Sequence, residues 1–246
     1  MSIDLSGRVA LVTGGARRLG RAFATGLASR GMDVAVHYGA SSDDADAVVA
    51  EIHALGRRAV AFNADLRDAA AAAALPQRVV DEFGRLDLLV NSAAVMERLT
   101  VEDTTVEQWD AIVNLNLRAP FFLAQQAAPH LRRTGGRIVN IADLGGLEPW
   151  RNYAAHSISK AGVVMLTKVL AVALAPDITV NAIAPGTVLV PDDYDDERRE
   201  FLSETTPLKR LGTPDDAVKA LLFLVEHGDF ITGETLVVDG GRLLRQ

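Results

Sequence analysis

Three side chains near the middle of the sequence could handle a proton together: Asp143, His156 and Lys160. His156 and Lys160 are four residues apart, so on a helix they project from one face. Asp143 stands thirteen residues before His156, just past an apolar stretch at 137–141 that predicts a buried strand. A carboxylate, an imidazole and an ammonium group at the end of a strand indicate a site that moves a proton to or from a substrate. The alternative is that a lone histidine and a lone lysine on a helix are ordinary surface groups.

The elements that must position these side chains follow from the alternation of short β-branched stretches with longer helical patterns. The predicted strands are 9–13, 33–37, 59–63, 86–90, 137–141, 179–183 and 235–238. The predicted helices are about 19–30, 42–55, 67–83, 106–133, 155–175 and 214–226. This alternation is typical of βαβ units. We expect an α/β fold with a doubly wound, seven-stranded parallel sheet and helices on both faces, in a single domain over 1–246.

The composition limits what such a site can do. Of the 246 residues, 49% are hydrophobic, which is enough for a core on both faces of a sheet. The formal net charge of −7 argues against nucleic acid and anionic membranes as partners. No cysteine is present, which excludes disulfides, thiolate metal sites and a cysteine nucleophile. Since no signal-peptide pattern and no apolar run approaching the roughly 20 residues that span a bilayer are found, we expect a cytoplasmic protein that acts on a small molecule and holds no metal.

A glycine-containing turn follows the first predicted strand directly. The residues TGGARRLG at 13–20 lead from that strand into a helix. Glycines allow a tight turn and a close approach of the backbone to a pyrophosphate, and a helix N-terminus attracts its negative charge. In the first βα turn of a long βαβ series, this pattern predicts a dinucleotide site.

The end of the second predicted strand favours NADPH over NADH. An NAD-selective fold usually places an acid there to bind the ribose 2′-hydroxyl, but here the first acid after His37 is Asp43. Arg17 could reach a 2′-phosphate, and Ser41 and Ser42 open a helix whose amides attract anions. The two serines could equally be plain helix caps.

Two further turns follow successive strands at the same edge of the predicted sheet. Asp65 and Leu66 come after the third strand, where the adenine ring is expected, and Asn91 and Ala93 come after the fourth. Open α/β sheets bind ligands at the carboxyl ends of their strands. Both turns are therefore predicted to contact the dinucleotide.

These motifs resemble the short-chain dehydrogenase/reductase family along essentially the whole chain. In order, they are the glycine turn, Asp65, Asn91-Ser92-Ala93-Ala94, Asn116, Ser159-Lys160-Ala161-Gly162, Asn181 to Gly186, Thr232-Gly233-Glu234 and Asp239-Gly240-Gly241. The resemblance implies a Rossmann-type fold, hydride transfer from a nicotinamide cofactor and a homotetramer.

The resemblance also implies roles for individual residues. Lys160 would hold the nicotinamide ribose and lower the pKa of the neighbouring acid, and Asn116 would keep a water that relays protons. With the positions above, the predicted cofactor contacts are Gly14, Arg17, Arg18, Leu19, Gly20, His37, Ser41, Ser42, Asp65, Leu66, Asn91, Ala93, Lys160, Pro185, Gly186 and Val188. A cover formed by about 188–211 is expected over a substrate pocket of Arg18, Met96, Asp143, Trp150, Tyr153, His156, Val190 and Tyr194.

Three positions depart from the family pattern. Arg18 stands where the family has glycine, Asp143 where it has serine, and His156 where it has tyrosine. Arg18 and Asp143 resemble the pteridine reductases, a branch that reduces pterin C=N bonds with NADPH. His156 and Met96 differ from that branch, since its members keep the tyrosine and carry an aromatic residue that stacks on the pterin.

These departures lead to a mechanistic hypothesis. Free histidine has a pKa near 6.5 and tyrosine near 10, so histidine is the stronger acid but is mostly deprotonated at neutral pH. Lys160 would disfavour the protonated ring of His156, whereas Asp143 would favour it. An imine nitrogen can take up a proton before hydride arrives, and the resulting iminium needs an anionic neighbour. We therefore expect Asp143 to protonate or stabilise the nitrogen of a C=N substrate, with His156 as proton relay or positioning donor.

Two alternatives remain open. Carbonyl reduction with NADPH belongs to the same class of reaction, with His156 as general acid in place of the tyrosine. An NADPH sensor or structural subunit without turnover belongs to another class, and the retained Lys160, Asn116 and Asp143 argue against it. The acidic run at 191–197 is consistent with neutral or cationic substrates, or simply with a solvated surface.

Overall fold

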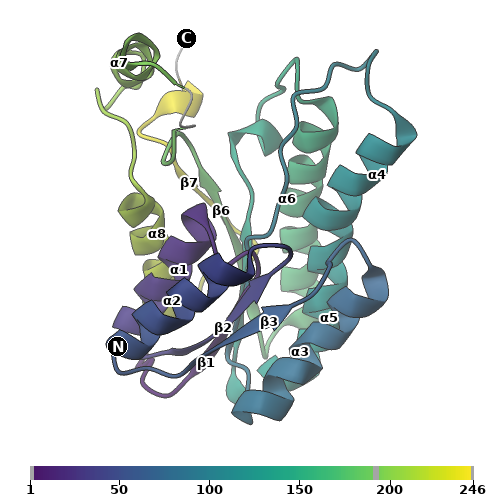
Figure 1. Ribbon diagram of the computed structural model, residues 1–246, viewed down its shortest axis with the longest axis vertical. Helices are drawn as coiled ribbons and strands as arrows, with labels where there is room; N and C mark the ends of the chain where they lie inside the picture. Colours follow the sequence, from purple (N-terminus) through teal and green to yellow (C-terminus); the bar gives the residue numbers. More distant parts are fainter. Residues whose placement is uncertain (1–2, 191–193, 245–246) are drawn as a thin grey trace.

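The computed structural model describes residues 3–190 and 194–244, and it holds a seven-stranded sheet between two layers of helices (Figure 1). Every strand pair is parallel, in the order β3-β2-β1-β4-β5-β6-β7. The strands are β1 (Val9–Val12), β2 (Asp33–Tyr38), β3 (Ala59–Asn63), β4 (Leu88–Asn91), β5 (Arg137–Ile141), β6 (Thr179–Pro185) and β7 (Thr235–Val238). The predicted doubly wound, Rossmann-type fold in a single domain is confirmed.

The helices cover both faces of this sheet (Figure 1). One face is covered by α1 (Arg18–Ser29), α2 (Ser42–Ala54) and α8 (Pro214–His227). The other is covered by α3 (Ala69–Phe83), α5 (Ala119–Thr134) and α6 (Ala154–Leu174), with the short α4 (Val106–Val113) beside α6. Every residue of β1, β4 and β5 is buried, as expected for a parallel sheet between two helical layers.

The helix predicted over 106–133 is interrupted. α4 begins at a capping box formed by Thr105 and Gln108, and the chain then makes the π-helical turn η1 (Asn114–Arg118) before α5 begins. A π turn changes the hydrogen-bond spacing without a clear mark in the apolar periodicity, so the sequence pattern reads as one helix. Such turns are frequent at functional sites, and this one places Asn116 in a buried position.

The cover predicted over 188–211 contains a helix that the sequence pattern does not indicate, α7 (Asp196–Glu204). None of its residues is buried, so it lacks the apolar stripe by which a helix is recognised. It lies beside the C-terminal residues (Figure 1), where the Leu208 amide donates to the Gly240 carbonyl oxygen. Of the acidic run, Pro191, Asp192 and Asp193 lie outside the described residues.

α6 carries apolar residues along most of its length. In the described part of the chain it is the one helix with the length and hydropathy of a bilayer-spanning segment, with 21 residues and a mean hydropathy of 1.6. The core helix of a soluble protein passes the same test, and α6 packs on β6 and carries the buried Lys160. We therefore interpret it as a core helix of the sheet layer.

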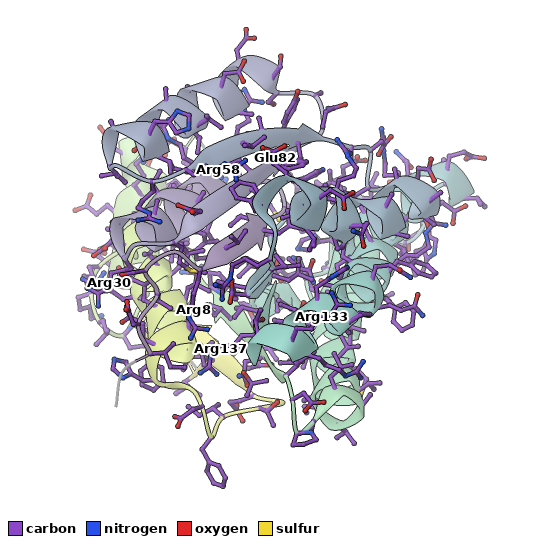
Figure 2. All side chains as sticks on the ribbon, turned by 90° about the horizontal axis from the view of Figure 1, so that it is seen from below. Arg8, Arg30, Arg58, Glu82, Arg133 and Arg137 are labelled. Atoms are coloured by element: carbon purple, nitrogen blue, oxygen red, sulfur yellow. The ribbon has the colours of Figure 1, made fainter. Side chains whose placement is uncertain are left out.

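The candidate site lies at the carboxyl end of the sheet, and ion pairs between distant segments of the chain lie at the amino end. β1 and β4 are neighbours, but their connections lead to helices on opposite faces, and ligands of open α/β sheets bind at the carboxyl end of such a switch point. Figure 2 looks onto the opposite end, where Arg58 pairs with Glu82 and Arg30 pairs with Glu226. The ion pairs at that end join segments that are far apart in the sequence, whereas the candidate chemical groups lie at the carboxyl end.

Candidate active site

Asp143 and His156 form a hydrogen-bonded pair at the carboxyl end of β5. Asp143 precedes the short turn η2 (Leu144–Gly146), and His156 lies in the first turn of α6. His156 Nε2 is 2.6 Å from Asp143 Oδ2, and His156 Nδ1 is 3.2 Å from the carbonyl oxygen of Val95. Both ring nitrogens face acceptors, an arrangement that only a doubly protonated imidazolium satisfies with two N–H donors. The His156 side chain is 2% exposed and that of Asp143 20%, so water competes little for this pair.

Lys160 lies one turn further along α6 and is also buried. Its Nζ donates to the carbonyl oxygen of Ile141 at 2.7 Å. Burial lowers the pKa of Lys160 from its usual value, and the charge of Asp143 partly opposes this. Burial raises the pKa of the Asp143 carboxyl, but the hydrogen bond from His156 and the charge of Lys160 outweigh it, so the net shift is downward. Asp143 is thus an ionised carboxylate at neutral pH.

Asn116, in the π turn η1, fixes the backbone segments on both sides of the His156 ring. Asn116 accepts from the Val95 amide and donates to the Val95 carbonyl, both at 2.9 Å. It also donates to Ser159 Oγ at 3.1 Å, and that hydroxyl donates to the carbonyl oxygen of His156 at 2.7 Å. One side chain therefore fixes both the acceptor of His156 and the helix that carries it. The water relay expected at Asn116 stays a prediction.

A cavity of about 240 Å³ opens beside the Asp143–His156 pair. Asp143, His156 and Lys160 line it, and Arg18 lines it from the start of α1. The remaining lining residues are Leu19, Ser92, Ala94, Val95, Met96, Ile141, Ala142, Pro185, Gly186, Val188 and Leu189. The groups that could move a proton thus border a space suited to a small reactant.

A second cavity, of about 490 Å³, lies over the glycine turn. Both cavities are lined by Arg18, Leu19, Ser92, Ala94 and Val95, so they adjoin. Of the predicted cofactor contacts, those in the larger cavity are Gly14, Arg17, Arg18, Leu19, Gly20, His37, Asp65, Leu66 and Ala93. Those in the smaller cavity are Arg18, Leu19, Lys160, Pro185, Gly186 and Val188. An elongated dinucleotide would extend from one cavity into the other.

The glycine turn fits a pyrophosphate. Gly14 has a φ of 64°, and a Cβ there would lie 3.0 Å from Ala93 Cα, so a side chain would be strained and crowded. Arg17 precedes α1 without a side-chain cap, which leaves the first-turn amides for an anion. Arg18 has a φ of 49°, a left-handed conformation that costs a non-glycine residue about 1–2 kcal/mol. A strained arginine that borders both cavities suits a phosphate-binding role.

His37 supports the glycine turn. The Gly14 amide donates to His37 Nδ1 at 3.1 Å, and His37 Nε2 donates to the Ala64 carbonyl oxygen at 3.0 Å. Burial lowers the pKa of His37 to about 4, so the ring is neutral at neutral pH and can accept from Gly14. His37 thus ties the turn after β1 to the end of β3, in addition to lining the cofactor cavity.

Other predicted contacts lie elsewhere. Three of them line neither cavity: Ser41, Ser42 and Asn91. The Ser41 side chain does not cap α2, and the Ser42 hydroxyl donates to Asp43. The alternative that the two serines are helix caps is therefore not supported either. Asn91 is buried and donates to Asn140 Oδ1 at 2.9 Å, which places it in the sheet core.

Arg17 lines the larger cavity but has a partner. Its Nε lies 2.7 Å from Asp44 Oδ2, in the first turn of α2. A 2′-phosphate would therefore compete with a carboxylate for this guanidinium. The sequence shows both residues but not their pairing, because the pairing depends on how α2 lies against the turn.

The predicted substrate pocket divides into two groups. Arg18, Met96, Asp143 and His156 line the smaller cavity, whereas Trp150, Tyr153, Val190 and Tyr194 do not. Trp150 stacks on His156 and packs at a steep angle against Tyr153, and Tyr194 packs under Arg198. Val95 and Leu189 line the cavity without having been singled out from the sequence. Val95 could have been found, since it directly follows the turn Asn91-Ser92-Ala93-Ala94.

Fold and site together define a class of protein. A Rossmann-type sheet with a glycine turn at its switch point, and a buried acid, histidine and lysine beyond it, is the arrangement of a nicotinamide-dependent oxidoreductase. The family model for enoyl-(acyl carrier protein) reductases matches residues 14–242. The chain belongs to the short-chain dehydrogenase/reductase family and is an NAD(P)H-dependent oxidoreductase.

Individual relatives match almost the whole chain. A 3-oxoacyl-[acyl-carrier-protein] reductase from Synechocystis is 38% identical over 98% of both chains. An L-rhamnose 1-dehydrogenase (NAD(P)(+)) from Sphingomonas is 36% identical over 96% of both. A crystal structure of a dehydrogenase/reductase from Sinorhizobium meliloti is 40% identical, with a TM-score of 0.91 over 97% of this chain and 96% of that chain. The name of the Synechocystis enzyme describes reduction of a carbonyl group, and the name of the Sphingomonas enzyme describes oxidation of an alcohol.

Proposed function

We propose that this protein uses NADPH to reduce a C=N bond in a small molecule, an imine or a pterin-like ring. The observation that supports this proposal is the buried pair of Asp143 and His156, 2.6 Å apart, at the wall of the smaller cavity. In the pattern of the family, two neutral hydroxyl groups occupy these positions. A carboxylate and an imidazole give the cavity a different charge distribution, and the charge of a reacting group decides which substrate suits it.

The sign of the charge favours nitrogen. Hydride addition to a ketone builds negative charge on oxygen, which the Asp143 carboxylate would repel. A protonated imine starts with positive charge, which the same carboxylate attracts. Two unit charges about 4 Å apart interact by about 4 kcal/mol at a protein surface. The positive charges of His156 and Lys160 beside Asp143 offset part of this attraction, so the net preference is smaller than that of an isolated carboxylate. The downward shift in the pKa of Asp143 keeps this charge in place across the neutral range.

The other side chains support that charge. His156 donates to Asp143 from Nε2, which fixes the carboxylate and provides a path for a proton between it and the ring. The ammonium group of Lys160 adds a second positive charge to the buried cluster around Asp143. Its hydrogen bond to the carbonyl oxygen of Ile141 holds it at the end of β5. Asn116 holds Val95, the other acceptor of His156. The cofactor supplies the hydride when bound, and the residues of the two cavities would hold it.

NADPH is proposed over NADH on the basis of the last residue of β2 and the two residues that follow it. Tyr38, Gly39 and Ala40 stand where an acid would bind the ribose 2′-hydroxyl of NADH. Arg17 lines the cavity at that end and can bind a 2′-phosphate if it leaves Asp44. Resemblance to pteridine reductases through Arg18 and Asp143 points the same way.

A second candidate is carbonyl reduction with NADPH. It is favoured by the relatives, since both named ones act on C=O or its alcohol. In this case an N–H of His156 would turn from its protein acceptor to the carbonyl oxygen and serve as general acid. Acid assistance of that kind is typically worth about 10²- to 10⁴-fold in rate.

Oxidation of NADPH by the purified protein separates these candidates. We expect turnover of a cyclic imine or a dihydropterin and little turnover of a ketone of the same ring size. From about pH 5 to about pH 9, turnover of the imine should fall as pH rises, because the nitrogen loses its proton. Faster reduction of the ketone would establish the second candidate instead. NADPH binding without turnover of any of these substrates would indicate a sensor or structural subunit.

The assembly proposed for this protein is a cytoplasmic homotetramer. α6 keeps a second apolar face that the sheet does not cover, with Met165 at 58%, Val169 at 53% and Val172 at 83% exposure. Phe121 on the neighbouring α5 is 40% exposed. A further copy of the chain is the simplest cover for this apolar surface.

A further inference from the structure

The imidazole of His156 has a flat aromatic neighbour in addition to its two polar partners. The ring of Trp150 is nearly parallel to it, with an angle of 13° between the planes and 6.1 Å between the centroids. This separation is within the range of offset-stacked aromatic pairs. Trp150 itself does not line the cavity, so the ring contacts the site through His156.

The indole is held in place from several sides. Trp150 Nε1 donates to Glu148 Oε1 at 3.1 Å, and the rings of Trp150 and Tyr153 meet at 73° with their centroids 6.0 Å apart. Gly145 leaves room for it, because a Cβ there would lie 3.0 Å from the indole Cε3 and 3.1 Å from Asp143 Oδ1. The same glycine therefore allows Trp150 and Asp143 to approach each other around His156.

We propose that Trp150 is a positioning residue whose indole face holds the imidazole of His156 in line with Asp143 and favours the protonated ring. The electron-rich face of an indole attracts a cation, and a parallel ring restricts rotation of the imidazole about χ2. The inference deepens the proposed function, since it rests on a working role for His156. It concerns a side chain that touches neither cavity.

Several charged or titratable groups act on the same imidazole. Asp143 accepts from it, Lys160 lies one turn away on α6, and Arg18 lies across the cavity. Glu148 accepts a hydrogen bond from Trp150, and the ring of Tyr153 packs against the indole. Asp143 and Lys160 have opposite effects on a protonated ring. A contact with Trp150 that changes the ratio of protonated to neutral imidazole a few-fold can therefore decide which form predominates.

The fluorescence of Trp150 tests the contact without any substrate. The chain has two tryptophans, and Trp109→Phe on the exposed side of α4 leaves Trp150 as the remaining emitter. A protonated imidazole in contact with an indole quenches its fluorescence, so emission should rise with increasing pH. His156→Asn in the same background should remove that rise. A rise of equal size after His156→Asn would overturn the proposal, whatever the enzyme reduces.

Activity tests the consequence, with Trp150→Phe and Trp150→Leu compared in the full-length protein. Phenylalanine keeps a flat ring, whereas leucine does not. We expect Trp150→Leu to lower kcat about threefold to tenfold, the size of an aromatic pair interaction, and to move the pH profile of kcat by about half a unit or more toward lower pH. KM for NADPH should stay the same, and Trp150→Phe should restore most of the rate.

The control is Trp109→Leu, which removes an exposed indole of α4 that does not line the smaller cavity. Equal losses for Trp150→Phe and Trp150→Leu with an unmoved pH profile would show that Trp150 only fills space, and would overturn the proposal. If Trp150→Leu fails to fold, the pH profile of Trp150→Phe and the fluorescence titration decide. If the C=N reaction is absent, the fluorescence titration alone still confirms or rejects the contact.

Discussion

At the scale of single residues, two positions that differ from the family pattern change the chemistry of the site: Asp143 replaces a serine and His156 replaces a tyrosine. Asp143 and His156 can be found in the sequence by their spacing to Lys160, and their place at the end of a strand follows from the apolar stretch before Asp143. Their mutual hydrogen bond could only be hypothesised. The bond from His156 Nδ1 to Val95, and the stack of Trp150 on His156, depend on how a loop from β4 and the entry of α6 meet, which no local pattern encodes.

His37 makes a prediction about acid stability. The pKa of His37 is about 4 in the fold, against about 6.5 in an unfolded chain. As pH falls from about 6.5 to about 4, the unfolded chain therefore takes up a proton that the folded chain does not, and stability is lost. The shift corresponds to about 3 kcal/mol. Below about pH 4 both states are protonated, and this contribution stops changing.

Urea unfolding of His37→Asn at several pH values measures this effect. Asparagine can accept from Gly14 without titrating, so the variant should lose much of the decline between about pH 6.5 and about pH 4. His53→Asn removes an exposed histidine and is the matched control. Equal loss of pH dependence in both variants would contradict the role of His37.

At the scale of elements, the sequence predicts the sheet better than the segments that cover it. Six helical stretches and seven strands lie within a few residues of their predicted places, because each buries an apolar face. The π turn η1 is hidden in a continuous helical pattern, and α7 buries no residue, so nothing in its periodicity marks it. The π turn lies beside the candidate site, where Asn116 holds Val95, and the packing of other elements decides its local conformation.

The pairing of α2 with the glycine turn makes a prediction about the cofactor. Asp44 holds Arg17 at 2.7 Å, so Asp44→Asn should free the guanidinium and remove a charge that repels phosphate. The dissociation constant for NADPH should fall by about threefold to tenfold, the effect of a unit charge near a solvated phosphate, while that for NADH stays the same. Titration calorimetry with both cofactors measures this.

Asp43→Asn is the control, because it removes the same charge from the same turn without touching the Arg17–Asp44 pair. A similar gain in NADPH affinity for Asp43→Asn would mean that the general field of α2 matters rather than Arg17. Parallel changes for NADPH and NADH would contradict a role at the 2′-phosphate.

At the scale of the whole molecule, the apolar character of α6 is visible in the sequence, but its use is not. One face packs on the sheet, and the other leaves Met165, Val169 and Val172 exposed. Val169→Glu should therefore reduce the mass measured by light scattering from that of an oligomer to that of a smaller species, because a charge would be buried between subunits. Leu55→Glu, at a site 48% exposed directly after α2, should leave the mass unchanged. An unchanged mass for Val169→Glu would contradict an interface at this face.

The most direct test of the central claim compares kcat/KM for a cyclic imine with kcat/KM for the matching ketone, before and after the double substitution Asp143→Ser/His156→Tyr. This variant restores the hydroxyl pair of the family pattern and leaves the rest of both cavities in place. We predict that the native protein prefers the imine, and that the ratio falls by about 10²-fold or more in the double variant. A native preference for the ketone, or the same ratio in both proteins, would contradict the claim that the Asp143–His156 pair selects a C=N substrate.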